Sequence, residues 1–143
     1  MSAWVAERAA RIAPADGLVV ADPSGLAPGT KATTGLLAAL LAHATTGGSA
    51  ELARVYADLP VAGLDGTLAG RYLSGPQRAG AGLVRAKTGT LTGVSSLAGT
   101  VVDSDGRLLV FAVAADRVPP SGTLEARAAL DRFAAALAGC GCR

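Results

Sequence analysis

The sequence of 143 residues has no asparagine, one histidine, two cysteines and two lysines. So few cysteines and histidines form neither a disulfide framework nor a four-ligand zinc site. No apolar run reaches the roughly 18 residues of a membrane-spanning helix, and the first residues lack the apolar segment of a signal peptide. Charged residues make up 17% of the chain and the net charge is +2, too little for a nucleic-acid-binding surface. We therefore expect no metal, cofactor, nucleic acid or membrane span.

Half of the residues are apolar, but 32 of them are alanine. The length suits a single domain. Cationic residues are biased, with 11 arginines against Lys31 and Lys87. Arginine and lysine are not interchangeable where a proton or a compact charge is needed. A lysine kept in an arginine-rich chain is therefore a candidate for a specific role.

Periodic apolar residues and turn signals predict the order of the elements. We expect helices over residues 2–13, 33–43, 49–59 and 123–137, a helical turn or two over 65–73, a short strand over 18–21 and a loop over 22–29. Strands are predicted over residues 80–90, 94–102 and 107–115, with Asp103-Ser-Asp-Gly as a hairpin turn. The last helix is expected to face the core with Leu124, Ala128, Leu130 and Phe133. Helices, then a three-strand antiparallel meander, then a terminal helix make an α+β fold.

Residues 86–90, Ala-Lys-Thr-Gly-Thr, combine groups that suit the recognition of a carboxylate. Lys87 and Thr88 are neighbours on a predicted strand and point to opposite faces, while Gly89 leaves the strand edge bare for a ligand. An ammonium and hydroxyls bind a carboxylate, and a following backbone N–H can point at a developing oxyanion. Lys-Thr-Gly is also an ordinary strand-to-turn tripeptide, so the motif alone leaves both interpretations open.

Three stretches resemble one enzyme family. Residues 84–99, Val-Arg-Ala-Lys-Thr-Gly-Thr-Leu-Thr-Gly-Val-Ser-Ser-Leu-Ala-Gly, resemble the third-motif region of the class C, low-molecular-mass penicillin-binding proteins. These are serine D-alanyl-D-alanine carboxypeptidases and endopeptidases. Residues 63–71 resemble the family's Gly-x-Asp-Gly-Thr-Leu segment, and residues 22–26 resemble its Asp-Gly-Ser-Gly-Leu loop. The resemblance covers nearly the whole chain and implies a partial β-lactamase-like, penicillin-binding-protein transpeptidase fold.

The resemblance also implies roles for four residues. Lys87 would orient the proton network and attract the substrate carboxylate, and Gly89 would keep the strand edge open. Thr88 and Thr90 would hydrogen-bond that carboxylate, with the Thr90 N–H completing the oxyanion hole. The implied partners are a peptidoglycan stem peptide ending in D-Ala-D-Ala and, in the full-length enzyme, β-lactams. The implied location is the cell envelope, outside the cytoplasmic membrane.

Two catalytic elements of the family have no counterpart here. The positions three before Lys31 and Lys87 are Pro28 and Val84, so no Ser-x-x-Lys is present, and without asparagine there is no Ser-x-Asn. We expect residues 1–143 to be a single C-terminal portion of the catalytic domain. Because catalytic residues of this kind act as a unit, the portion alone should be inactive. It should also expose a sheet edge that other strands would cover.

Two other functions stay open at this point. One is a non-catalytic α+β module that binds a peptide or a partner through its strand edge. The other is a fragment of a different β-lactamase-like serine hydrolase that shares only the Lys-Thr-Gly strand.

Further residues are better explained by structure than by chemistry. Ser24 fits a turn, and Asp103 with Asp105 fits a hairpin. His43, near the C-terminal end of its helix, fits either an exposed cation favoured by the helix dipole or a packed residue. Cys140 and Cys142 flank one glycine, where a mutual disulfide would be strained, so we expect free thiols or an incidental tail.

Overall fold

The computed structural model describes residues 1–141, which fall into two compact units, 1–56 and 57 onward. No helix within these described residues is long and apolar enough to cross a membrane. That residues 1–143 make up a single portion of one catalytic domain stays a prediction.

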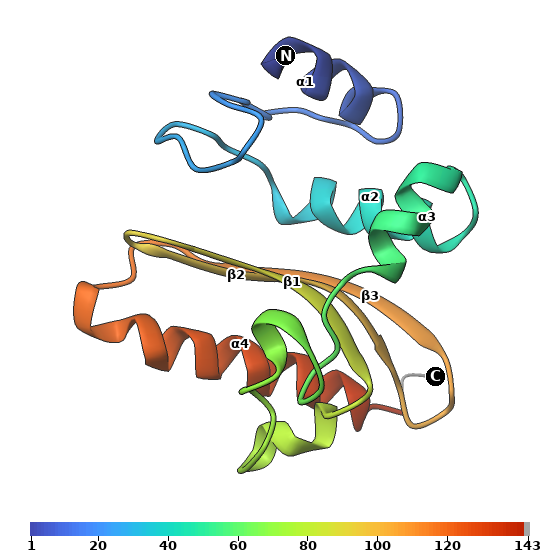
Figure 1. Cartoon of the computed structure of the whole chain (residues 1–143), viewed down its shortest axis with the longest axis vertical. Helices are drawn as coiled ribbons and strands as arrows, with labels where there is room; N and C mark the ends of the chain where they lie inside the picture. The colour runs from blue at the N-terminus through green and yellow to red at the C-terminus, as the bar shows by residue number, and fades with distance from the viewer. Residues whose placement is uncertain (142–143) are drawn as a thin grey trace. The chain divides into compact units, whose positions relative to one another are not determined.

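The first unit contains three helices, drawn from blue to green in Figure 1. They are α1 (Ser2–Ala10), α2 (Thr34–Thr45) and α3 (Ala50–Ala57). The sequence predicts a cap at Thr33 or Thr34, and Thr33 provides it, since its hydroxyl accepts a hydrogen bond from the Leu36 N–H at 3.1 Å. The strand predicted over 18–21 is wrong in extent, because only an isolated bridge between Val19 and Lys31 forms.

The second unit is a three-stranded antiparallel sheet with a long helix along one face (Figure 1). Its elements are η1 (Gly66–Leu68), η2 (Pro76–Gly80), β1 (Val84–Leu91), β2 (Val94–Val102), β3 (Leu108–Ala115), η3 (Pro120–Gly122) and α4 (Thr123–Ala138). The strand order is β1-β2-β3, because each connection is short enough for only an antiparallel neighbour. The predicted meander and α+β class are confirmed.

The core lies between this sheet and α4. Its buried members share one side of the strands and the inner side of the helix; they include Val84, Ala86, Leu97, Val101, Leu130 and Ala134. Ala86 lies opposite Gly99 in the β1–β2 register. A Cβ on Gly99 would lie 2.0 Å from the Arg85 carbonyl oxygen, so the close approach of the two strands requires glycine there.

The inward face predicted for α4 is partly wrong. Leu130 is buried as expected, but Leu124 is 76% exposed and Phe133 is 44% exposed, its ring packing edge-on against Phe111. The helix instead buries Asp131 together with its alanines, because Asp131 is paired with Arg71 of the segment before η2. A carboxylate can be buried when it has a charged partner. The helix therefore turns the side that carries Asp131 inward, and not the side predicted from the spacing of its apolar residues.

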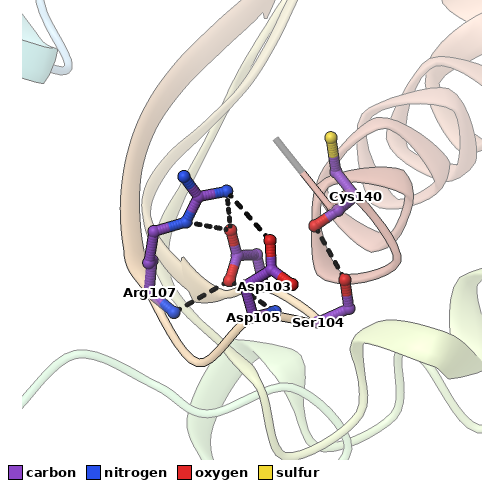
Figure 2. A network of polar contacts seen from close by, with 5 residues as sticks. All are labelled: Asp103, Ser104, Asp105, Arg107 and Cys140. Atoms are coloured by element: carbon purple, nitrogen blue, oxygen red, sulfur yellow. Dashed lines mark hydrogen bonds and ion pairs between the residues drawn. The ribbon is translucent and has the colours of Figure 1, made fainter. Parts of the chain in front are cut away.

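The predicted Asp-Ser-Asp-Gly hairpin joins β2 to β3 and also contacts Cys140, just after the end of α4 (Figure 2). The buried Asp103 carboxylate accepts hydrogen bonds from the Asp105 and Arg107 N–H groups and from the Arg107 guanidinium. The Ser104 hydroxyl donates to the Cys140 carbonyl at 3.0 Å. Cys140 is disulfide-bonded, so the expected free thiol is wrong there; Cys142 lies outside the described residues. Asp103 and Asp105 thus belong to the hairpin turn, as predicted.

Candidate active site

The candidate site is built on the second half of β1, where one edge of the strand opens. At the start of β1 this edge is paired, since the Ala62 N–H donates to the Val84 carbonyl and the Ala86 N–H donates to the Pro60 carbonyl, both at 2.9 Å. Backbone groups of alternate residues point to the same edge of a strand. The N–H and C=O groups of Thr88 and Thr90 therefore point outward beyond this pairing. Within residues 1–141 no backbone hydrogen bond reaches them from that side.

Lys87 places its ammonium group at the same open edge. The side chain is exposed, and Nζ donates a hydrogen bond to the outward carbonyl of Thr88 at 2.7 Å. A positive charge thus lies beside the two outward N–H groups of Thr88 and Thr90. Such an edge attracts an anion and can hydrogen-bond it.

The hydroxyls of Thr88 and Thr90 lie on the other face of the strand from Lys87, since side chains alternate. Thr88 Oγ1 lies 3.1 Å from the hydroxyl oxygen of Thr67 in η1. Thr90 Oγ1 accepts a hydrogen bond of 3.2 Å from Nη2 of Arg127 in α4. Two separate elements therefore orient the two hydroxyls, and neither contact was predicted from the sequence.

Gly89 faces Ser96 across the β1–β2 pair. A Cβ on Gly89 would lie 2.3 Å from the Ser96 hydroxyl oxygen. The missing side chain therefore makes room for Ser96, which would have to change rotamer to accept an alanine. The proposed opening of the strand edge by Gly89 stays a prediction.

A buried ion pair lies next to Arg127, the residue that contacts Thr90. Arg71 binds Asp131 through two bonds, Nε to Oδ2 at 2.9 Å and Nη2 to Oδ1 at 2.6 Å. The two side chains are 18% and 7% exposed, and Arg71 Nη2 also reaches the carbonyl of Arg127 at 3.5 Å. Burial raises the pKa of the neighbouring Tyr72 above its ordinary value, helped by the Asp131 charge. These residues line a cleft of about 240 Å³ that also reaches Arg127.

The remaining sequence candidates do not join this site. The Ser24 hydroxyl donates to the Asp22 carboxylate, which also accepts the N–H groups of Gly25 and Ala27. The hydrogen bond from Ser24, above all, lowers the pKa of Asp22. His43 lies against Gly48, where a Cβ would meet its ring at 2.2 Å. Ser24 thus belongs to a turn, as predicted, and of the two alternatives left open for His43 the structure shows the packed residue.

Comparison with known proteins decides the family. Residues 10–137 match the D-Ala-D-Ala carboxypeptidase 3 (S13) family. The chain belongs to this family. The predicted resemblance is therefore confirmed, and so is the enzyme class at the level of the family.

Among the relatives, the chain is similar to carboxypeptidase DacB of Mycolicibacterium smegmatis, with 42% identity over 128 residues. It is also similar to a D-alanyl-D-alanine carboxypeptidase of Actinomadura sp., with 43% identity over 95 residues. These matches cover 88% and 64% of this chain but only 27% and 17% of the relatives. The chain thus spans about a quarter or less of the length of these proteins.

The fold comparison agrees. The crystal structure of penicillin-binding protein 4 from Haemophilus influenzae matches with a TM-score of 0.65 and 30% identity, covering 92% of this chain and 28% of that one. Its complex with a β-lactam matches with a TM-score of 0.69 and 27% identity, covering 95% and 30%. The predicted partial penicillin-binding-protein fold is confirmed.

Proposed function

We propose that this chain supplies the carboxylate-binding strand of a D-Ala-D-Ala carboxypeptidase. Its substrate would be a peptidoglycan stem peptide ending in D-Ala-D-Ala, acted on outside the cytoplasmic membrane, and β-lactams would bind at the same place. The observation that carries the proposal is the open edge of β1, with the Lys87 ammonium 2.7 Å from the Thr88 carbonyl. Support comes from the family match and from the β-lactam complex of a structural neighbour.

Each residue of the strand has a separate task in this proposal. The hydroxyls of Thr88 and Thr90 donate to the substrate's terminal carboxylate, while the Lys87 charge draws that carboxylate to the edge. The outward Thr90 N–H donates to the oxyanion that forms when the scissile carbonyl is attacked. Gly89 leaves the strand edge free for the substrate backbone.

The attacking serine is contributed by polypeptide other than these 143 residues in this proposal. The sequence contains neither Ser-x-x-Lys nor Ser-x-Asn, so the chain acts as the C-terminal portion of a larger catalytic domain. Peptide-bond cleavage then needs both parts, since the nucleophile and the groups that stabilise the oxyanion act on one carbonyl.

A chimera tests the proposal. The matching 128 residues of the M. smegmatis carboxypeptidase are replaced by the corresponding segment of this chain, and the product is incubated with a fluorescent penicillin. We expect covalent labelling of the chimera and none of the isolated 143-residue chain. A folded chimera that stays unlabelled would contradict the proposal and favour a non-catalytic peptide-binding module. Labelling of the isolated chain would contradict the proposal that the attacking serine lies outside these 143 residues.

The other alternative, a fragment of a different β-lactamase-like hydrolase, is disfavoured by the match over residues 10–137.

A further inference from the structure

Arg127 is the side chain of α4 that reaches the candidate carboxylate site. Its Nη2 donates to Thr90 Oγ1 at 3.2 Å, although the two residues are 37 positions apart in the sequence. A hydroxyl that accepts a bond from a guanidinium keeps its own hydrogen free to donate elsewhere. Arg127 therefore turns Thr90 into a hydrogen-bond donor, which is what a bound carboxylate needs.

Arg127 has no ion-pair partner among the residues that the structure describes. Within residues 1–141 no carboxylate forms an ion pair with Arg127 or with Lys87. Arg71, the other arginine of the adjoining cleft, is already neutralised by Asp131. Two uncompensated cations therefore lie on either side of the Thr88–Thr90 strand. Arg127 is half-buried, so solvent and salt screen it less than a fully exposed charge.

The backbone next to this guanidinium is held in place. The carbonyl of Arg127 accepts a hydrogen bond of 3.5 Å from Nη2 of Arg71, and Asp131, one turn further along α4, fixes Arg71 through two bonds. A cation that is oriented before the ligand arrives loses less entropy on binding.

We propose that Arg127 is a specificity-determining residue that binds the terminal carboxylate of the peptide together with Thr90. The guanidinium has five N–H donors in a planar fork and uses one on Thr90, which leaves others for a carboxylate oxygen. This proposal rests on the proposed function of the β1 edge. It makes the site selective for a free C-terminal carboxylate over an amide.

The test is a titration of the 143-residue chain followed by amide chemical shifts. The ligands are N-acetyl-D-Ala-D-Ala and its C-terminal amide, and the readout is the ratio of their affinities. The variants are Arg127→Gln, Arg127→Lys and Thr90→Val. Arg132→Gln is the matched control, since Arg132 is an exposed arginine of the same helix.

We expect the wild-type chain to prefer the carboxylate and Arg127→Gln to bind it about tenfold more weakly, because a hydrogen bond to a charged group is lost. The amide should bind equally to both, and Arg127→Lys should keep part of the preference. If Arg127→Gln lowers the affinity for the carboxylate and for the amide equally, the role of Arg127 is merely structural and the inference is overturned.

The outcomes separate the two proposals. If Thr90→Val loses the carboxylate preference while Arg127→Gln keeps it, the inference about Arg127 is wrong and the proposed function stands. If the wild-type chain shows no preference for the carboxylate, the proposed function fails and the inference fails with it. If Arg132→Gln matches Arg127→Gln, the effect is a general one of helix charge and the inference is overturned.

Discussion

The hydroxyl oxygen of Thr88 lies 3.1 Å from the hydroxyl oxygen of Thr67. This contact joins the Lys-Thr-Gly strand to the Asp-Gly-Thr-Leu segment 21 residues before it. Thr90, two residues further along the strand, is held in turn by Arg127 of α4. The two hydroxyls proposed to bind substrate are thus each oriented by an element outside the sheet, which suits a site that must be rigid before the ligand arrives.

The Arg71–Asp131 pair gives the first prediction. Replacing Asp131 by alanine leaves the Arg71 guanidinium largely buried without its partner, so we expect a loss of about 3 kcal/mol or more in the free energy of unfolding. Urea denaturation of the chain measures it. The double variant Arg71→Met/Asp131→Leu should lose much less, because no buried charge is left unpaired. Exposed ion pairs contribute less than about 1 kcal/mol. A loss in that range for Asp131→Ala would show that the Arg71–Asp131 pair does not stabilise the fold as a buried pair does.

Gly99 gives the second prediction. An alanine Cβ there would lie 2.0 Å from the Arg85 carbonyl oxygen and 2.6 Å from Ala86. Since backbone must move to relieve this overlap, Gly99→Ala should cost about 1–3 kcal/mol of stability. Thermal unfolding checks this, with Gly70→Ala as the control, because a Cβ at Gly70 meets nothing within 4 Å. Equal melting temperatures for the two variants would rule out the close approach of β1 and β2.

The third prediction concerns the pH dependence of the free energy of unfolding, which follows from the lowered pKa of Asp103. Burial alone would raise the pKa of this carboxyl, but hydrogen bonds from the backbone and guanidinium of Arg107 and from the Asp105 N–H lower it below its ordinary value of 3.8. A lowered folded-state pKa stabilises the fold fully above that ordinary value, and the contribution is lost as pH falls through the folded pKa.

The measurement compares unfolding at neutral pH and in acid. Asp103→Asn should be less stable than wild type at neutral pH and should lose less stability on acidification. The exposed Asp116 offers the control Asp116→Asn, which should follow the wild-type curve. If Asp103→Asn follows it as well, the network of Figure 2 contributes nothing to stability.

Local signals in the sequence predicted much of the second unit. β2 spans Val94–Val102 as expected, because a run of β-branched residues ends at a strong turn sequence. The cap of α2 was predicted at Thr33 or Thr34, since a hydroxyl beside an apolar repeat is a local feature, and the structure has it at Thr33. The Lys-Thr-Gly strand was found from three consecutive residues and the family resemblance around them.

The parts that failed depend on residues far apart in the chain. Arg71 and Asp131 are 60 positions apart, so nothing near Asp131 in the sequence shows that a carboxylate will be buried there. For that reason the inward face predicted for α4 is wrong at Leu124, which is exposed. The contact of Arg127 with Thr90 was not predicted either. From the sequence alone an arginine on a helix is expected to be exposed to solvent, and its partner on the strand is 37 positions away.

The role of Lys87 is tested most directly in the chimera with M. smegmatis carboxypeptidase, by the rate of acylation with fluorescent penicillin. Lys87→Ala removes the ammonium at the open edge of β1, and Lys31→Ala, the change at the other lysine of the sequence, is the matched control. We expect Lys87→Ala to slow acylation at least about 100-fold, the cost of removing one catalytic electrostatic group, while Lys31→Ala labels at the wild-type rate. Near-normal acylation of the Lys87→Ala chimera would contradict the assignment of this strand to the catalytic site.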